Sequence, residues 1–308
     1  MSIAKKMTYL RSLGFLNSKE VILDWLLKRQ STQFNRLWLK FQDIGLEFGG
    51  PSKVFARNGY CPAYKFARQV DNVNFSGVTA WHGSIAPGGN FVFDIRKPPG
   101  LQHILDAGDL SKIADSSYDF ILSSHMLEHT ANPLKLIFEW KRMLKNSGIL
   151  LLVLPHKDNT FDHRRPLTTL QHFIEDFRKN TPEDDTTHLK EILDLHDLSL
   201  DKSQNSPAKF RSWIENNHAN RGAHHHVFSS FNAAQLINFA GLKILDIEPR
   251  RPFDIFILAE KMNTELSVDN SAFLSWSAKY LAKSPFKSDQ LAYLDLTQNN
   301  AVGMEVSG

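Results

Sequence analysis

Two adjacent glycines, Gly49 and Gly50, follow a short apolar run that begins at Ile44. Such a run typically forms a buried parallel strand, and glycines after it favour a tight turn, because glycine accepts positive φ and lets the backbone approach a ligand closely. In open α/β sheets, ligands bind beyond the carboxyl ends of the strands, usually at the first strand-to-helix turn. We therefore expect a ligand-binding turn here, although the full Gly-x-Gly-x-x-Gly pattern is missing.

An acidic residue, Asp71, follows the glycines at a spacing of about twenty residues. A second short strand is predicted over residues 65–70, so this carboxylate would stand at the tip of the strand. A carboxylate at that tip can accept hydrogen bonds from both hydroxyls of a ribose. The spacing therefore favours a ligand that contains a ribose.

Strands and helices alternate along the rest of the chain. Further strands are predicted at 101–105, 118–123, 149–154, 242–247 and 253–260, and helices at 133–144, 232–240 and 273–281. Residues 72–100, rich in Asn, Gly and Pro, suggest an irregular excursion or a hairpin. The alternation predicts βαβ units, a parallel sheet and right-handed crossovers, with the last two strands forming an antiparallel hairpin at the sheet edge.

Composition divides the chain into a main α/β domain, residues 42–261, and its additions. Residues 1–41 are predicted to form an N-terminal helical segment, and residues 262–308 a C-terminal helix followed by a mobile tail. The charged, histidine-rich stretch 157–223 is too long for an ordinary connection. Because long insertions at the ligand end of a sheet are often functional, we expect it to form a mainly helical lid over a substrate.

The overall composition limits the classes of partner. The chain has 308 residues, a formal charge of +3 and one cysteine, Cys61. Since Lys and Arg are dispersed, no nucleic-acid partner is expected. Neither a signal peptide nor a stretch of about 18 apolar residues is present, so no membrane insertion is expected. The single cysteine fits a reducing compartment, and we expect the cytoplasm.

The order of these motifs resembles the class I S-adenosylmethionine-dependent methyltransferases. The resemblance is carried by the following segments: Leu46-Glu47-Phe48-Gly49-Gly50, Asp71, Asp106-Ala107, Tyr118 to His129, Asn132-Pro133 and Lys141 to Gly148. It covers roughly residues 42 to 155 and 231 to 261. The chain departs from the family where Pro51-Ser52 replaces the usual third glycine, and in the longer stretch 72–100.

This resemblance implies a fold, a cofactor and the residues that bind it. The implied fold is a doubly wound, mostly parallel seven-stranded sheet with an antiparallel last strand, and the implied cofactor is S-adenosylmethionine. The implied cofactor-binding residues are Glu47, Gly49, Gly50, Asp71, Asn72, Asp106, Ala107 and Ser124. Among them, Glu47 would meet the ammonium group, Asp71 the ribose and Asp106 the adenine amino group.

Methyl transfer to a hydroxyl needs orientation and a base. His125 and His156 follow the fourth and fifth predicted strands, and histidine titrates near neutral pH. We take these two, with Asp162 at the start of the lid, as the candidate catalytic residues.

The acceptor-binding residues are expected in and just after the lid. Arg164 and Arg165 could clamp an anionic group, with His172 and His226 beside them. A lid of this kind resembles methyltransferases that act on sugars and polysaccharides, so we expect O-methylation of a polar small molecule or sugar. The triplet His224-His225-His226 with His156, Asp162 and His172 offers metal ligands, but no recognised spacing supports a metal, and none is expected.

Two other classes of protein stay open at this point. One is a dinucleotide-dependent oxidoreductase, against which the missing third glycine argues. The other is a non-catalytic methyltransferase-like module whose insertion binds a protein partner. Retention of the glycine turn and of Asp71 argues against this second class.

Overall fold

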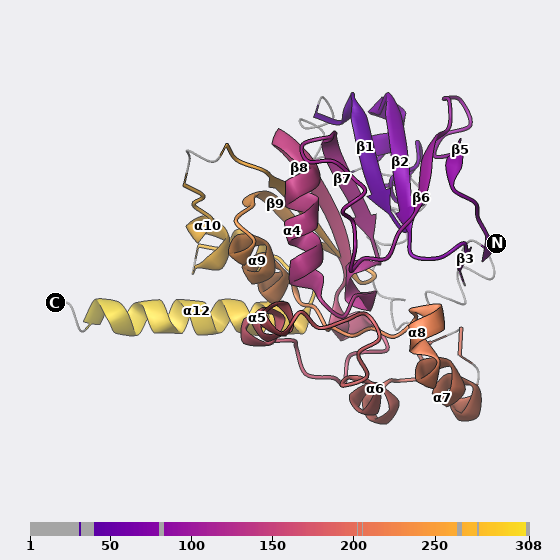
Figure 1. Cartoon of the computed structure of the whole chain (residues 1–308). Helices are drawn as coiled ribbons and strands as arrows, with labels where there is room; N and C mark the ends of the chain where they lie inside the picture. The colour runs from indigo at the N-terminus through magenta and orange to yellow at the C-terminus, as the bar shows by residue number, and fades with distance from the viewer. Residues whose placement is uncertain are drawn as a thin grey trace.

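The structure is a computed structural model, and it describes most of the chain (Figure 1). The described residues are 31, 40–79, 83–201, 203–204, 206–263, 267–275 and 277–305. The predicted N-terminal helical segment, 1–41, lies almost wholly outside them. None of the helices in the described ranges combines the length and the apolarity that a membrane span requires.

One mixed sheet forms the centre of the fold, with strand order β5-β6-β2-β1-β7-β8-β10-β9. Its strands are β1 (Ile44–Phe48), β2 (Gln69–Asn74), β5 (Gly88–Phe91), β6 (Gly100–Ile104), β7 (Tyr118–Ser124), β8 (Leu144–Pro155), β9 (Lys243–Arg250) and β10 (Asp254–Glu260). Strands β6, β2, β1, β7 and β8 pair in parallel, whereas β10 runs antiparallel between β8 and β9. The mostly parallel doubly wound fold with an antiparallel last strand is therefore confirmed.

The sheet has eight strands instead of the predicted seven. The additional strand, β5, pairs antiparallel with β6 and forms one edge of the sheet. It comes from the stretch 72–100, where Phe91 and Phe93 are buried in the core. The same stretch contains the small hairpin of β3 (Val78–Thr79) and β4 (Gly83–Ser84), so the hairpin alternative is found, and the edge strand was not predicted.

Hydrophobic side chains cover both faces of the sheet. On one face, Trp140 of α4 (Pro133–Met143) and Leu236 of α9 (Ser230–Phe239) pack in a cluster with Leu46 of β1. On the other face, Phe55 and Tyr64 pack against β7 and β10. Since strands β1, β7 and β8 are covered on both sides, their nearly continuous apolar sequences are the expected pattern for central parallel strands.

The second strand lies further along the chain than predicted. Residues Ala63–Phe66 form the short helix α3, and β2 runs from Gln69 to Asn74. The predicted strand 65–70 is therefore wrong by about four residues, an error within the range expected for sequence-based boundaries. Asp71 consequently lies inside β2, and Asn74 stands at its carboxyl end.

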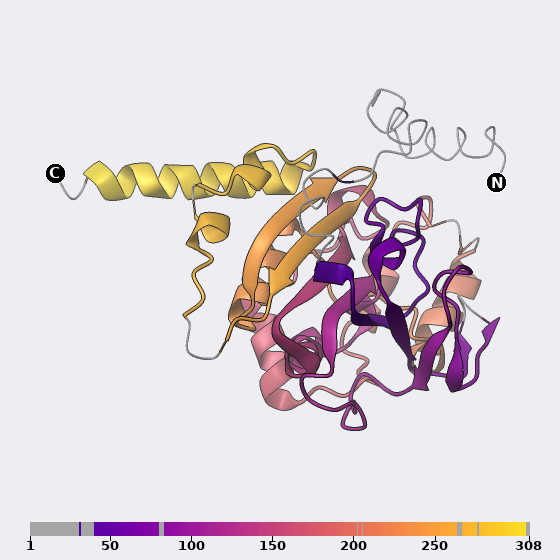
Figure 2. The same cartoon turned by 90° about the horizontal axis from the view of Figure 1, so that it is seen from above.

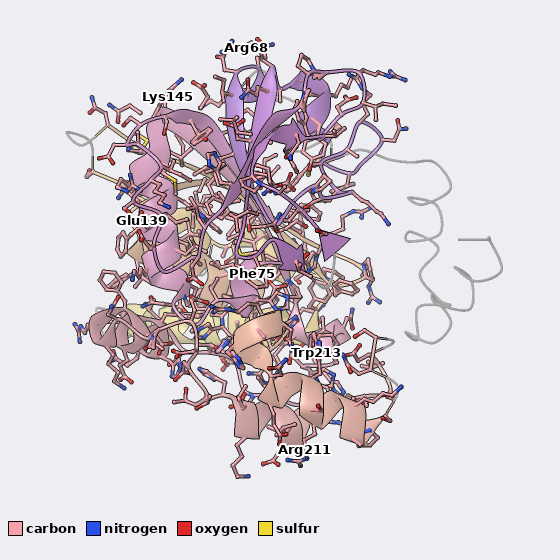
Figure 3. The ribbon with its side chains drawn as sticks, turned by 45° about the vertical axis from the view of Figure 1, so that its right-hand side comes forward. Arg68, Phe75, Glu139, Lys145, Arg211 and Trp213 are labelled. Atoms are coloured by element: carbon pink, nitrogen blue, oxygen red, sulfur yellow. The ribbon has the colours of Figure 1, made fainter. Side chains whose placement is uncertain are left out.

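The insertion at 157–223 is mainly helical, as predicted. Its helices are α5 (Leu170–Lys179), α6 (Leu189–Leu195), α7 (Pro207–Glu215) and α8 (Asn217–Asn220). They lie at the carboxyl ends of the parallel strands, and the labelled Arg68 and Lys145 lie at the opposite end of the sheet (Figures 1 and 3). On α7, Trp213 lies on the side nearer the sheet and Arg211 on the side away from it (Figure 3). The helices therefore flank the edge where ligands bind in such sheets.

The C-terminal region differs from its prediction. The single helix expected over 273–281 is wrong, because α10 (Ser271–Leu274) and α11 (Lys279–Ala282) are separate short helices. The expected tail is largely the helix α12 (Lys287–Glu305), which projects beyond the body of the domain (Figure 2). The start of α12 is attached to the domain, since the buried Asp289 accepts hydrogen bonds from the backbone N–H (3.0 Å) and hydroxyl (2.6 Å) of Ser230.

We predict that Asp289→Ala lowers the free energy of unfolding by about 3 kcal/mol, because it leaves buried donors of Ser230 and Ser284 without their charged acceptor. Urea unfolding followed by circular dichroism measures this loss. The exposed Asp295 on the same helix provides the matched control, and Asp295→Ala should change stability by less than about 0.5 kcal/mol. Equal effects of the two substitutions would contradict the attachment.

Candidate functional site

The glycine turn after β1 is held in shape by its neighbours. Gly49 has φ 79°, in the region that favours glycine. At Gly50 an added Cβ would lie 2.2 Å from the carboxylate of Glu47, so a larger residue would displace that carboxylate. The N–H of Gly50 donates to the side-chain oxygen of Asn72 at 2.9 Å, and the amide of Asn72 donates to the Gly50 carbonyl at 3.4 Å. The turn is thus fixed from β2 as well as from β1.

Glu47 supports the turn from behind. Its side chain is fully buried, and it accepts hydrogen bonds from the Ser52 N–H at 3.0 Å and from the Tyr64 hydroxyl. Burial raises the pKa of Glu47 to about 7, against the opposing effect of these hydrogen bonds. Pro51 and Ser52 stand in place of the third glycine. The Glu47 side chain, rather than the backbone freedom of a glycine, therefore fixes this part of the loop.

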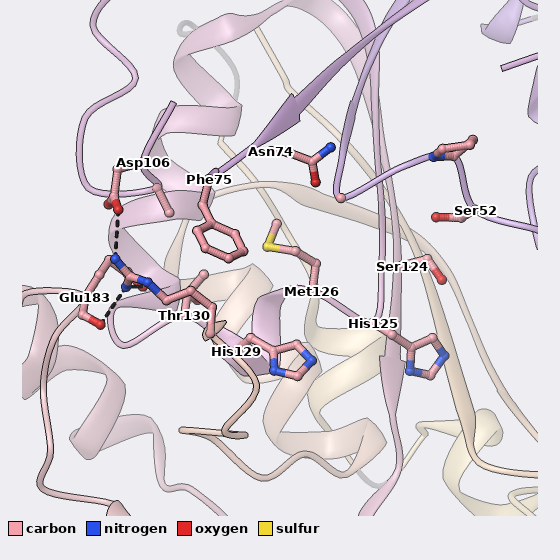
Figure 4. Close-up of a pocket in the computed structure, with 14 residues that line it drawn as sticks. Ser52, Asn74, Phe75, Asp106, Ser124, His125, Met126, His129, Thr130 and Glu183 are labelled. Atoms are coloured by element: carbon pink, nitrogen blue, oxygen red, sulfur yellow. Dashed lines mark hydrogen bonds and ion pairs between the residues drawn. The ribbon is translucent and has the colours of Figure 1, made fainter. Parts of the chain in front are cut away.

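A cavity of about 290 Å³ opens in front of the turn (Figure 4). The turn contributes Gly49 and Ser52, the loop after β6 contributes Asp106, and the end of β7 contributes Ser124 and His125. The cavity therefore lies beyond the carboxyl ends of the parallel strands, where ligands bind in this kind of sheet.

The predicted cofactor-binding residues fall into three groups. Gly49, Asp106, Ala107 and Ser124 line the cavity. Gly50 belongs to the turn but does not line this cavity, and Glu47 and Asn72 hold the turn from behind. The prediction for Asp71 needs correction. The Asp71 side chain is buried within β2 and accepts hydrogen bonds from the Leu101 N–H at 2.8 Å and from the Tyr118 hydroxyl at 3.1 Å. Its position joins three strands and does not reach the cavity wall.

Asn74 and Phe75 occupy the place at the strand tip that was predicted for Asp71. Both line the cavity (Figure 4). The Asn74 amide nitrogen is buried and finds no hydrogen-bond partner among the described residues. A buried donor without a partner is costly, and a ribose hydroxyl would satisfy it. The site therefore fits a nucleoside-containing cofactor such as S-adenosylmethionine, and Asn74 rather than Asp71 is placed where a ribose could be met. Only a correctly placed strand end could have indicated this residue.

The lid closes one end of the cavity through an ion-pair network. Arg221, after α8, donates to Asp106 at 2.9 Å and to the Glu183 carboxylate at 3.1 Å (Figure 4). Burial raises the pKa of Glu183 to about 7, because it outweighs the effect of Arg221. Asp106 also accepts from the Gly108 N–H at 2.8 Å, so both of its oxygens are already engaged. Sequence analysis did not identify Arg221 or Glu183, which lie far from Asp106 along the chain.

His125 lies at the opposite end of the cavity, next to the turn. It follows β7 with φ 50°, a strained value for a residue other than glycine that is often found at functional sites. Its Nε2 lies 2.9 Å from Asp254, and its Nδ1 3.8 Å from Glu128. Burial opposes protonation of the ring, but the hydrogen bond and charge of Asp254, with the charge of Glu128, raise the pKa of His125 above its ordinary value.

His156 does not reach the cavity wall. The side chain is fully buried and stacks on Phe286 with ring centroids 3.9 Å apart. Its Nδ1 accepts from the Asp158 N–H at 3.2 Å, and its Nε2 lies 3.2 Å from Asp289. The prediction of His156 as a base is therefore wrong, because the C-terminal segment covers it.

The predicted arginine clamp is also wrong. Arg165 is buried and donates to Asp162 at 2.9 Å, to Glu191 at 2.7 Å and to the His224 carbonyl at 2.7 Å. Arg164 is half-exposed and pairs with Asp197 at 2.7 Å. The two guanidinium groups thus serve different partners within the lid, as alternating side chains of consecutive residues often do.

A second cavity of about 190 Å³ adjoins the first, and the ring of His129 lines both. Asp162 and His224 lie on its wall, with the His224 Nδ1 2.6 Å from the carboxylate of Asp162. Although burial opposes ionisation, His224 and Arg165 hold the pKa of Asp162 well below its usual range. The predicted substrate residues His172 and His226 line neither cavity and meet each other elsewhere, beside Asp176.

Comparison with known proteins yields a family-model match and structural similarities. Residues 95–152 match the model of a family described as a methyltransferase domain. None of the curated proteins compared with the chain is similar to it in sequence.

Several solved structures are similar at low identity. A methyltransferase from Methanosarcina mazei has 14% identity and a TM-score of 0.41, over 76% of this chain and 99% of that one. A putative methyltransferase from Listeria monocytogenes has 17% identity and a TM-score of 0.38, over 75% and 98%. The 1,6-didemethyltoxoflavin-N1-methyltransferase of Burkholderia thailandensis, with bound S-adenosylhomocysteine, has 11% identity and a TM-score of 0.41, over 85% and 92%. At these values the similarities indicate no acceptor.

The family match falls on the segment that contains β7 and α4, and Asp106, Ser124 and His125 of this segment line the cavity. Together with the strand order, this match supports the predicted class I S-adenosylmethionine-dependent methyltransferase fold. A methyltransferase domain agrees with S-adenosylmethionine, the predicted cofactor, and the alternative of a dinucleotide-dependent oxidoreductase is not supported.

Glu47 makes the stability of the protein depend on pH. Its pKa is about 7 in the folded protein, against 4.5 ordinarily, so its contribution to stability is fully present below about pH 4.5 and is lost as the pH rises through 7. We predict that Glu47→Gln removes this dependence. The free energy of unfolding of the variant, relative to that of wild type, should therefore rise by about 3 kcal/mol between pH 5 and pH 8. Urea unfolding at both pH values measures the change.

The exposed Glu215 provides the control, since Glu215→Gln should shift stability equally at both pH values. A Glu47→Gln difference that is independent of pH would show that Glu47 does not titrate in this range.

Proposed function

We propose that this methyltransferase transfers its methyl group to a hydroxyl of a polar, carbohydrate-like acceptor bound in the second cavity. The observation that supports this most is the shared wall: His129 borders both the cofactor cavity and the second cavity. The two cavities are therefore neighbours, so an acceptor in the second cavity would lie next to the cofactor. Residues 157–223, which supply most of this cavity, act as the substrate lid in this proposal.

The lining of the second cavity supports a sugar-like acceptor. Aromatic rings of Phe161, Phe210 and Trp213 provide flat apolar surfaces, and the carboxylates of Asp162 and Asp201 provide acceptors for hydroxyl groups. A few polar groups among apolar surfaces is the usual composition of a small-molecule site. Sugars present hydroxyl groups at the ring edge and C–H groups on the ring face, so they match both kinds of surface.

We assign the role of general base to His224, with Asp162 as its orienting carboxylate. The 2.6 Å contact between His224 Nδ1 and Asp162 leaves Nε2 of the ring to accept a proton. Arg165, which donates to Asp162 at 2.9 Å, keeps that carboxylate ionised. S-adenosylmethionine, when bound, would supply an electrophilic methyl group and leave as S-adenosylhomocysteine when its S–CH3 bond breaks. His224 would accept the proton of the acceptor hydroxyl as the new O–C bond forms.

His125 is the second candidate for the base, because it lines the cofactor cavity and pairs with Asp254 at 2.9 Å. Its place beside the glycine turn favours a different role, contact with the amino-acid end of the cofactor. The two roles are separable, since loss of a base lowers turnover while loss of a cofactor contact weakens cofactor binding.

We predict that His224→Gln lowers turnover by about 10² to 10⁴-fold and leaves cofactor affinity close to wild type, because it removes the base without altering the cofactor cavity. His125→Gln should mainly weaken cofactor binding. His218, exposed on α8, provides the control, and His218→Gln should keep full turnover. If His125→Gln loses turnover and His224→Gln does not, the base is His125.

The proposed acceptor class is tested by a screen with methyl-labelled S-adenosylmethionine over sugars, nucleotide sugars, phosphorylated metabolites and phenols. A product methylated on a sugar hydroxyl is expected. Methylation on nitrogen or carbon would contradict the proposed chemistry and leave the methyltransferase class intact. A cytoplasmic site of action also stays a proposal, which rests on the single, buried, unpaired Cys61.

A further inference from the structure

Four side chains converge between the lid and the body of the domain. We propose that His172, Asp176, His188 and His226 bind one divalent transition-metal ion, for which zinc is the best match, and that this ion fastens the lid. The proposal is independent of the acceptor and of the base. Sequence analysis expected no metal, because the separations between these residues match no recognised ligand pattern.

The distances between the four groups fit one tetrahedral ion. The Nε2 atom of His172 lies 3.2 Å from Nε2 of His188 and 3.3 Å from the carboxylate of Asp176. The same carboxylate lies 3.7 Å from Nε2 of His226, which brings this ring next to the other three groups. One ligand atom from each residue can be chosen so that all lie within 4.8 Å of one another. Ligands about 2.0–2.1 Å from a tetrahedral zinc ion lie roughly 3.3 Å apart, close to these values.

Buried atoms without partners point to a missing ligand. The Asp176 oxygen nearest the histidines is buried and finds no hydrogen-bond partner in the described part of the chain. His226 is fully buried at its side chain, and its Nδ1 is likewise without a partner there. If Nε2 of His226 donates to the Ala131 carbonyl at 3.2 Å, Nδ1 carries a free lone pair. Metal-binding histidines usually donate their other ring N–H to such a carbonyl.

The ligand set favours zinc over the harder cations. Three imidazoles and one carboxylate form a nitrogen-rich site, whereas magnesium and calcium prefer oxygen ligands. Four protein ligands leave no open position on a tetrahedral ion, which is the arrangement of structural rather than catalytic zinc sites.

The four ligands come from three segments that a bound ion would hold together. His172 and Asp176 lie one turn apart on α5, and His188 directly precedes α6. His226 lies in the segment that returns to the body, where Phe228 bridges to the end of β8. The separate apolar cluster of the lid contains only four buried residues among those described, namely Ile192, Phe210, Ile214 and Ala223. A core this small gives a physical reason for an additional link.

The first test is the zinc content of the untagged full-length chain after loading with zinc sulfate and dialysis, measured by mass spectrometry of the metal. We expect about one zinc per chain and a higher melting temperature with zinc than with a chelator. Cobalt in place of zinc should give the strong visible absorption of a tetrahedral site. A wild-type chain that retains far less than one zinc, or whose cobalt form lacks this absorption, would overturn the proposal.

Variants locate the ion. His172→Gln and Asp176→Asn should each lower zinc affinity by at least about 10-fold. The matched control is His163→Gln, since His163 also lies in the lid and pairs with an aspartate, Asp197 at 2.9 Å, but is not one of the four ligands.

His172 is the safer substitution, because its side chain is 39% exposed, and circular dichroism checks that the variant is folded. Zinc retained by the folded His172→Gln variant as in wild type would place any bound ion elsewhere and overturn the proposal. If neither ligand variant folds, the melting temperature of the wild-type chain with and without zinc decides: a rise supports the proposal, and no change overturns it.

Discussion

The glycine turn depends on a buried carboxylate. Glu47 lies under the turn with no solvent contact, and its hydrogen bond from the Ser52 N–H fixes the loop that fronts the cofactor cavity. Burying an acid is unfavourable unless its oxygens find donors, and here Tyr64 and Ser52 supply them. The absence of a side chain at Gly50 is required by the same arrangement, since any Cβ would strike the carboxylate. A non-standard turn sequence thus yields an open cavity at the usual place.

Residues of the lid and of the main domain together form both cavities. Arg221 joins the lid to Asp106 in the loop after β6, while Asp162 near the start of the insertion and His224 directly after its end meet at 2.6 Å. Both cavities are therefore built from residues far apart in sequence. Many polar side chains of the lid bind one another, as Arg165 binds Asp162 and Glu191. This explains why a dense polar cluster in the sequence contributes few groups to the proposed acceptor cavity.

The sequence predicted the sheet well because its central strands are nearly continuous apolar runs, which only a covered parallel sheet accommodates. It misplaced β2, where the short apolar signal around Val70 did not fix the boundary, and so named Asp71 instead of Asn74. The sequence also indicated His156 as a base and the Arg164-Arg165 pair as a substrate clamp. Whether these side chains are exposed depends on which other segments of the chain cover them. Contacts such as that of His156 with Phe286 arise from tertiary packing and leave no local pattern.

The central claim is that the cavity in front of the glycine turn binds S-adenosylmethionine. Isothermal titration calorimetry of the full-length chain with S-adenosylhomocysteine tests it most directly, with a nicotinamide dinucleotide as the comparison ligand. The account predicts binding of about one S-adenosylhomocysteine per chain and no heat from the dinucleotide. Binding of the dinucleotide without binding of S-adenosylhomocysteine would contradict it.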